Sequence, residues 1–324
     1  MMIGTKILAV GAYAPERVVA NSEFESFLDT SDEWITTRSG IRRRHFSSES
    51  NCSMAVKAAQ QAIEKAGVEA ASIDLIIGTT VTGDTITPAM ANLVQKHLGA
   101  EHAVSFDINA ACTGFVYGID IANQFIANGR IKRALIVSAE RISKIVDFSD
   151  RSTCVLFGDG AGAILMEADE NSPVPTGAIH TTIDEKDVLY CTSFDDTCAF
   201  DHHTDVIHMG GLKMNGREVY KFAVHAMAKS VQEVLTKAGK TIDDVDVLVP
   251  HQANERIVRT AAQKLGIEMD KVALCMDEYG NTSSASIPLA LSRMEKEGRL
   301  KHGQTVVLTG FGAGLTYGAV LLQW

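Results

Sequence analysis

Cys112 carries the most reactive kind of side chain in this sequence, and its neighbours give it a suggestive setting. It lies in residues 107–115 (D-I-N-A-A-C-T-G-F), after an apolar run at 103–106 that is typical of a strand. Another apolar run follows at 116–128 and is typical of a buried helix closed by Gly129. A cysteine at such a strand-to-helix turn lies beside unpaired helix N–H groups, which favour the thiolate. The sequence therefore predicts a nucleophilic thiolate, although a buried and inert cysteine is the commoner situation.

Three further polar segments follow predicted strands in the second half of the sequence. They are His251 within 250–254 (P-H-Q-A-N), Asn281 within 278–284 (E-Y-G-N-T-S-S) and a glycine-rich turn at 310–314 (G-F-G-A-G). Ligand sites of α/β proteins form where strands end, and small residues let the backbone present N–H groups to a substrate. Taken alone, His251 is more often structural, and Asn281 is more often a turn residue. Together with the cysteine, these segments predict one site.

An internal repeat carries these segments. Lys65-Ala66-Gly67 before an apolar run recurs as Lys237-Ala238-Gly239, and Gly129-Arg130 recurs as Gly298-Arg299, about 170 residues later in each case. Alternating strands and helices in both copies indicate two α/β halves with mainly parallel or mixed sheets.

The two halves are expected to span residues 1–170 and 171–324, with a linker at 169–176 (D-E-N-S-P-V-P-T). A strand at 272–275 is expected as the counterpart of the strand at 103–106. If a pseudo-twofold axis relates the halves, Cys112 and Asn281 face one another across it.

Composition excludes several classes of protein. The 324 residues are 46% hydrophobic and 22% charged, as in ordinary soluble proteins, and the net charge of −10 argues against binding to nucleic acid or to anionic membranes. The N-terminus carries no signal peptide, and no apolar run is long enough to span a bilayer. Six cysteines without C-x-x-C spacing indicate a reduced, cytoplasmic protein.

A cluster of acidic and histidine residues in the second half could in principle ligate a metal. Its spacing matches no standard zinc pattern, so we expect no metal site there. The cluster comprises Asp201, His202, His203, Asp205 and His208.

In their order and spacing, the four segments resemble those of thiolase-fold condensing enzymes, and more narrowly those of the β-ketoacyl-acyl-carrier-protein synthase III family. The resemblance runs from Lys6 to the last residue and includes T-S-D-E-W-I-T-T-R-S-G-I-R at 30–42. It implies a thiolase-like fold of two α/β halves with mixed sheets, in five layers α-β-α-β-α. Ala313 departs from the glycine that many members carry, and Arg217 from the asparagine of some.

The resemblance implies a decarboxylative condensation of an acyl-coenzyme A primer with malonyl-acyl carrier protein, at the start of type II fatty acid synthesis. Cys112 would form the acyl-enzyme, and the N–H groups of Cys112 and Ala313 would bind the oxyanion. His251 and Asn281 would stabilise the enolate. No cofactor is needed beyond the thioester substrate. A polyketide-type condensing enzyme and a cysteine-dependent thioester hydrolase remain the alternatives.

The family also implies binding residues. Coenzyme A would be held by Thr30, Trp34, Arg38 and Arg151. An acidic carrier protein requires local positive charge on a chain of net charge −10. The candidates are Arg217, Lys221, Gln252, Arg256, Arg259 and Lys264, of which Arg256 matches the arginine that binds the carrier in the family. The family is homodimeric, and Thr87 would close the primer pocket of the partner subunit, where many acetyl-specific members carry Phe.

Overall fold

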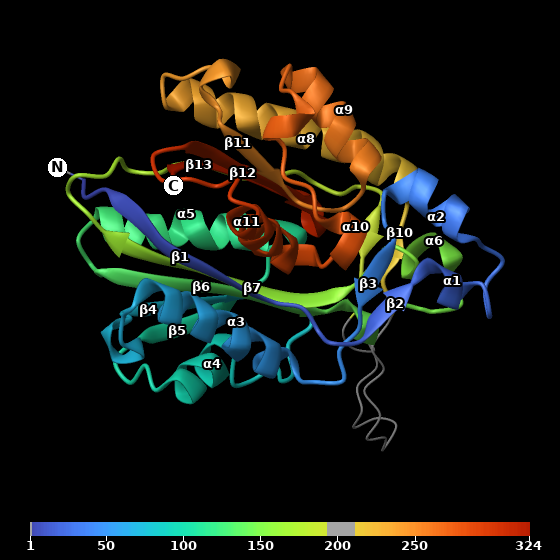
Figure 1. Ribbon diagram of the computed structural model, residues 1–324, viewed down its shortest axis with the longest axis horizontal. Helices are drawn as coiled ribbons and strands as arrows, with labels where there is room; N and C mark the ends of the chain where they lie inside the picture. The colour runs from blue at the N-terminus through green and yellow to red at the C-terminus, as the bar shows by residue number, and fades with distance from the viewer. Residues whose placement is uncertain (1, 193–210) are drawn as a thin grey trace.

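Two large β-sheets and three layers of helices form the body of the chain (Figure 1), beside two small sheets, β2-β3 and β9-β10. The computed structural model describes residues 2–192 and 211–324. Helices α8 (Gly216–Lys237) and α9 (Glu255–Leu265) cover one outer face, and α3 (Asn51–Ala66) and α4 (Met90–Leu98) cover the other. Helices α5 (Gly114–Ala127) and α11 (Ser286–Lys296) lie between the sheets. The predicted five-layered α-β-α-β-α fold is confirmed.

The first sheet has the order β1-β7-β6-β4-β5. Strands β4 and β5 are parallel to each other, β4 and β6 are parallel, and β7 runs antiparallel to both β6 and β1. Among the described residues, β5 pairs only with β4, so it is one edge of this sheet and β1 is the other. The strands are β1 (Thr5–Tyr13), β4 (Leu75–Thr79), β5 (Val104–Ile108), β6 (Arg133–Arg141) and β7 (Asp159–Ala168).

The second sheet has the order β11-β12-β13-β8, with β11 parallel to β12 and the other pairs antiparallel. Its strands are β8 (Thr176–Thr181), β11 (Val247–Pro250), β12 (Thr305–Gly312) and β13 (Thr316–Gln323). The left-handed glycines that end α3 and follow α8, Gly67 at φ 64° and Gly239 at φ 65°, occupy matching places in the repeat.

The predicted strand at 272–275 is wrong. Within the described residues, this segment joins the sheet by one parallel bridge, between Leu248 and Val272, at which Ala273 N donates to Leu248 O at 2.8 Å. The side-chain amide of Gln252 donates to Ala273 O at 3.1 Å, and its Oε1 accepts from Cys275 N at 2.8 Å. The Gln252 side chain therefore takes up backbone groups that a strand ladder would use.

Shorter elements surround the carboxyl ends of the strands. The N-terminal segment at 18–45 packs on the core of the second half. Its side chains Val19, Phe24, Ile35 and Ile41 are buried in one cluster with side chains of α8 and α9. These elements are β2 (Val18–Ala20), α1 (Asn21–Phe24), α2 (Asp32–Ser39), β3 (Arg43–His45), α6 (Arg151–Cys154), β9 (Leu189–Tyr190), β10 (Lys213–Met214) and α10 (Met276–Tyr279). None of the helices in the described ranges is both long and apolar enough to cross a membrane.

Candidate active site

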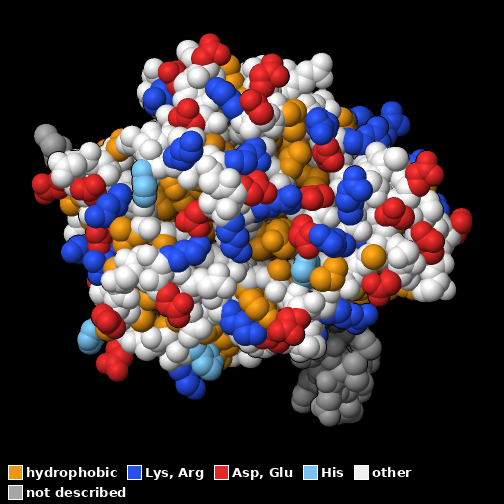
Figure 2. Space-filling view, in the orientation of Figure 1, with side chains coloured by type: hydrophobic (Ala, Val, Ile, Leu, Met, Phe, Trp, Pro, Cys, Tyr) orange, Lys and Arg blue, Asp and Glu red, His pale blue; other side chains and the backbone are white. Residues whose placement is uncertain are grey.

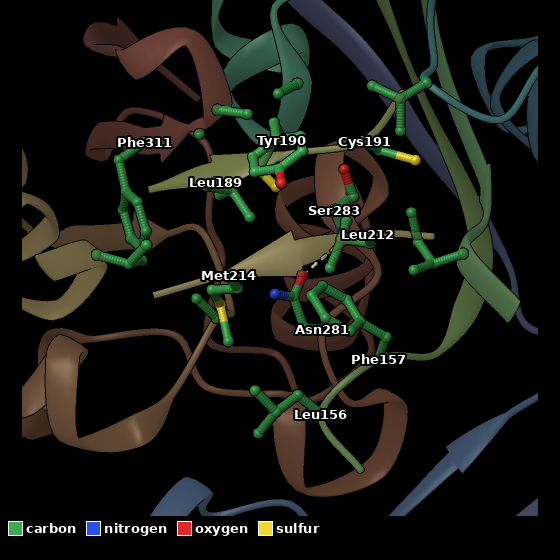
Figure 3. A pocket seen from close by; sticks show the side chains of 18 of the residues that line it. Leu156, Phe157, Leu189, Tyr190, Cys191, Leu212, Met214, Asn281, Ser283 and Phe311 are labelled. Atoms are coloured by element: carbon green, nitrogen blue, oxygen red, sulfur yellow. Dashed lines mark hydrogen bonds between the residues drawn. The ribbon is translucent and has the colours of Figure 1, made fainter. Parts of the chain in front are cut away.

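A cavity of about 470 Å³ brings the predicted reactive residues together. Cys112, His251, Asn281 and Ala313 all line it, although they come from four separate segments of the chain. Most of the remaining wall is apolar (Figure 3). The cavity can therefore hold an acyl chain beside a thiol, an imidazole and a carboxamide.

Cys112 lies on a short 3₁₀ turn, Ala111–Thr113, between β5 and the first residue of α5. Ala111 has φ 47°, a left-handed conformation that non-glycine residues seldom adopt. Gly312 at the end of β12 packs directly against this turn, because a Cβ there would lie 2.7 Å from the backbone N of Cys112. The second sheet thus fixes the position of the cysteine carried by the first.

The surroundings of Cys112 do not support the predicted thiolate. Burial is the main cause that raises the pKa of the Cys112 thiol to about 12, and the charge of Glu140 adds to the rise. The Ser283 hydroxyl and the N–H of Cys112 itself oppose it. Loss of hydration by the thiolate therefore favours the protonated thiol at this half-buried position.

His251 directly follows β11 and is 1% exposed. Its backbone N donates to Thr309 O at 2.8 Å, which ties it to β12, and its Nδ1 lies 2.7 Å from Ser286 Oγ at the start of α11. Burial lowers the pKa of His251 to about 3, so the imidazole is neutral at physiological pH. A neutral ring held at Nδ1 leaves Nε2 for a substrate.

Asn281 is held on both its backbone and its side chain. Its backbone N donates to Leu156 O at 2.9 Å, and its carbonyl accepts from Gly158 N at 3.0 Å. The side-chain Oδ1 accepts from the backbone N of Ser283 at 2.9 Å. Figure 3 shows the amide nitrogen on the side away from this bond, so that Asn281 presents a hydrogen-bond donor to the cavity.

The predicted coenzyme A residues form one cluster beside the cavity. The guanidinium carbons of Arg38 and Arg151 lie 4.4 Å and 4.9 Å from the ring centroid of Trp34 on α2. Ser152, the residue after Arg151, lines the cavity. Thr30 precedes α2, and its buried Oγ1 has no hydrogen-bond partner. The cluster therefore offers an aromatic face and two cations close to the cavity.

The predicted carrier-binding residues divide into exposed ones and one buried one. Arg217, Lys221, Arg256, Arg259 and Lys264 are exposed on α8 and α9. Lys221 pairs with Glu218 and Arg259 pairs with Glu255, whereas Arg256 has no acidic partner within the described residues. Figure 2 shows basic side chains, interspersed with acidic ones, over the region of α9 and α2.

The prediction that Gln252 binds a carrier protein is wrong. Its side chain is fully buried, and its amide also donates to Pro250 O at 2.7 Å. A side chain in that position cannot touch a carrier protein, and it instead joins β11 to the segment at 273–275. No local pattern predicts this burial, because glutamine is usually a surface residue.

Thr87 lies outside the cavity of its own chain. It belongs to an exposed loop between β4 and α4, where the preceding Ile86 is 79% exposed. The predicted role of Thr87 requires a second subunit and stays a prediction.

Several cavity residues were missed by sequence reasoning. They include Ile142, Ile145, Phe157, Leu189, Tyr190, Leu212, Met214 and Tyr220. These apolar residues are scattered along the sequence, and no local pattern shows that they line one cavity. The fold brings them together. The cluster Asp201, His202, His203, Asp205 and His208 lies outside the described residues. Within those that are described, no group of three or more His, Cys, Asp or Glu could hold a metal ion.

Comparison with known proteins gives the same assignment along the whole chain. The family described as 3-oxoacyl-[acyl-carrier-protein (ACP)] synthase III matches residues 106–185, and the C-terminal part of that family matches residues 235–324. A β-ketoacyl-[acyl-carrier-protein] synthase III from Clostridium acetobutylicum is 44% identical, and the match covers 100% of this chain and 99% of the relative.

Solved structures agree. The crystal structure of 3-oxoacyl-[acyl-carrier-protein] synthase III from Aquifex aeolicus VF5 matches with a TM-score of 0.91 at 42% identity, covering 99% of this chain and 100% of that one. The priming β-ketosynthase of the R1128 polyketide pathway matches with a TM-score of 0.89 at 35% identity, covering 99% and 96%.

The fold, with a cysteine, a histidine and an asparagine on one cavity, defines a condensing acyltransferase of the thiolase-like class. Within that class, the chain belongs to the β-ketoacyl-[acyl-carrier-protein] synthase III family.

Proposed function

We propose that this chain condenses an acyl-coenzyme A primer with malonyl-acyl carrier protein, and so begins type II fatty acid synthesis. The products are a 3-oxoacyl-carrier protein, CO₂ and free coenzyme A. The observation that carries the proposal is the convergence of Cys112, His251 and Asn281 on one apolar cavity.

In the first half-reaction, Cys112 attacks the thioester carbonyl of the primer. The sulfur becomes acylated, and the thiol proton leaves with coenzyme A as its free thiol. The tetrahedral oxyanion needs fixed donors, a role we assign to the backbone N–H groups of Cys112 and Ala313. Their proximity is supported by the packing of Gly312, the residue before Ala313, against the N of Cys112.

In the second half-reaction, malonyl-carrier protein loses CO₂, and the resulting enolate attacks the acyl carbonyl of the acyl-enzyme. The C–S bond to Cys112 breaks, and the sulfur takes up a proton to regenerate the thiol. His251 and Asn281 donate hydrogen bonds to the thioester oxygen as it gains negative charge. Both side chains are neutral donors on rigid supports, which is the arrangement that electrostatic preorganisation requires. The scheme uses no cofactor, because the cysteine is the nucleophile and loss of CO₂ generates the enolate.

Both substrates would enter past α2 and α9. Asn254 Nδ2 donates to Arg38 O at 3.0 Å, so the Trp34 cluster and the first turn of α9 lie side by side. We assign Thr30, Trp34, Arg38 and Arg151 to coenzyme A. Exposed Arg256, which has no acidic partner in the described parts of the chain, is the first candidate for an acidic carrier protein, with Arg217, Lys221, Arg259 and Lys264 around it.

The active species we propose is a cytoplasmic homodimer. An unpaired edge strand favours association, and Val104 on β5 is 61% exposed. A partner covering β5 would also meet the loop that carries Ile86 and Thr87. The division into halves 1–170 and 171–324 is supported by the sheets, since β1–β7 stop at Ala168 and β8 begins at Thr176.

One assay tests the proposal against its alternatives. Acyl-coenzyme A and malonyl-carrier protein are incubated with the enzyme, and the carrier-bound product is identified by mass spectrometry. We expect a 3-oxoacyl group two carbons longer than the primer. Free fatty acid without a condensed product would indicate a thioester hydrolase instead. Exclusive use of a carrier protein from a polyketide pathway would favour the role of the R1128 relative.

A further inference from the structure

Glu140 is a buried carboxylate that the scheme above does not use. It lies near the carboxyl end of β6, is 0% exposed and has no cationic partner among the described residues. Five hydrogen bonds from neutral groups reach its two oxygens. A buried charge held only by neutral donors is costly, so its position calls for an explanation.

One oxygen of Glu140 holds the turn that follows Asn281. Oε1 accepts from Ser283 Oγ at 3.1 Å and from Ser284 Oγ at 2.8 Å. Ser283 has φ 51°, a strained conformation that its surroundings must maintain, and its N–H fixes the carboxamide of Asn281. The direction of the Asn281 amide therefore depends on a turn anchored to Glu140.

The other oxygen holds the loop after β4. Oε2 accepts from the backbone N of Val81 at 3.1 Å, from Thr82 Oγ1 at 2.8 Å and from Thr80 Oγ1 at 3.2 Å. The Val81 side chain lines the cavity. Glu140 thus joins the cavity wall at Val81 to the Asn281 turn, across two segments about 200 residues apart in sequence.

Glu140 also affects Cys112. The Ser283 hydroxyl is shared between the Cys112 thiol, whose pKa it lowers, and Glu140 Oε1. Burial raises the pKa of Glu140, and the hydrogen bonds that it accepts oppose this rise. In its ionised form, Glu140 disfavours the Cys112 thiolate. Removing that charge while keeping the shape should make Cys112 more reactive toward a small electrophile. Loss of the positioning role of Glu140 should therefore slow condensation, whereas loss of its charge should speed the alkylation of Cys112.

We propose that Glu140 is a positioning residue for both half-reactions, in which Oε1 fixes the Asn281 turn and Oε2 fixes the cavity wall at Val81. This inference rests on the roles proposed above for Cys112 and Asn281. Glu140 touches neither substrate, and it acts through Ser283, Ser284 and the loop at 80–82.

The first experiment compares Glu140→Gln with the wild type. Misplacement of Asn281 should lower kcat for condensation by about 10- to 100-fold. Alkylation of Cys112 by iodoacetamide at pH 7.5, followed by mass spectrometry of its peptide, should become roughly 3- to 10-fold faster. The control is Glu167→Gln on the neighbouring strand β7, where the carboxylate pairs with Lys6 and Arg133 far from the cavity. It should leave both rates within twofold of wild type.

The second experiment tests the roles of Oε1 and Oε2 of Glu140 separately. Ser284→Ala should lower malonyl decarboxylation by preformed acyl-enzyme, with self-acylation by acyl-coenzyme A unchanged. Thr82→Val should raise KM for acyl-coenzyme A in self-acylation, and Thr82→Ser, which keeps the hydroxyl, should restore it. These variants also decide the question if Glu140→Gln does not fold.

The inference is overturned if folded Glu140→Gln condenses within twofold of wild type, or if its Cys112 is alkylated more slowly. It is equally overturned if neither Ser284→Ala nor Thr82→Val changes its half-reaction. Failure of the proposed function looks different, because the wild-type enzyme would then yield no 3-oxoacyl product at all.

Discussion

The Nδ1 atom of His251 lies 2.7 Å from the hydroxyl oxygen of Ser286, and both residues are buried. The same oxygen accepts from the backbone N of Gln252 at 3.2 Å. When Ser286 donates its own proton to Nδ1, the imidazole keeps its proton on Nε2. Burial holds the pKa of His251 near 3, so the ring stays neutral across the physiological range.

Malonyl decarboxylation should therefore show no loss of rate from His251 between pH 8 and pH 5. The folded-state pKa is depressed, so protonation of the ring begins only as the pH falls toward 3. The measurement is the release of CO₂ from malonyl-carrier protein by preformed acyl-enzyme, which removes the titration of Cys112. An acid limb with a midpoint near pH 6.5 that disappears in His251→Gln would contradict this assignment.

The three proposed catalytic residues should fail at different steps. Cys112→Ser should abolish acyl-enzyme formation, because an alcohol lacks an accessible thiolate. His251→Ala and Asn281→Ala should acylate normally and lose decarboxylation by about 100-fold or more, as when an oxyanion donor is removed. Intact-mass detection of the acyl-enzyme and CO₂ release separate the two steps. Condensation at the wild-type rate by either alanine variant would remove that residue from the enolate-stabilising pair.

Alkylation of Cys112 should depend steeply on pH. Because its pKa is raised to about 12, the thiolate fraction below that value should grow about tenfold per pH unit. The rate with iodoacetamide should therefore rise without a plateau from pH 7 to pH 10. The buried thiol of Cys275, whose pKa burial also raises, provides an internal comparison in the same digest. A plateau below pH 9 would show that the start of α5 outweighs burial after all.

Reversing the charge of Arg256 should weaken only the carrier-dependent step. We expect Arg256→Glu to raise KM for malonyl-carrier protein about tenfold at low salt, through lost electrostatic complementarity, and to leave self-acylation unchanged. Arg130→Glu is the matched control, because Arg130 is exposed and follows α5 at the far end from the cavity. Equal losses in both half-reactions would point to a folding defect.

The side chain at position 87 should set the preferred primer length. A threonine where acetyl-specific relatives carry phenylalanine leaves a deeper pocket, and each buried CH₂ of primer is worth roughly 0.8 kcal/mol, or about fourfold in kcat/KM. Acetyl-, isobutyryl- and hexanoyl-coenzyme A should be compared in the wild type and in Thr87→Phe. We expect the wild type to accept the longer primers and the variant to lose them. A wild type as strict for acetyl as the variant would show that other side chains fill the space.

Local patterns in the sequence were enough to predict much of the site. The strand-turn-helix around Cys112 and the strand end before His251 are encoded within a few residues, and the repeat located their counterparts. Two errors came from non-local effects. The burial of Gln252 depends on packing against the 273–275 segment. The pKa of Cys112 depends on its burial by residues from distant parts of the sequence. Glu140 gave no sequence signal, because its five donors come from two distant loops.

The two helices between the sheets each pack on strands of both halves of the sequence. Helix α5 belongs to the first half but also packs on β8 and β13, and α11 belongs to the second half but packs on β1 and β7. Side chains of both helices share one buried cluster with strands of both sheets. Each half alone would therefore expose an apolar sheet face, and the whole chain should unfold in one cooperative transition.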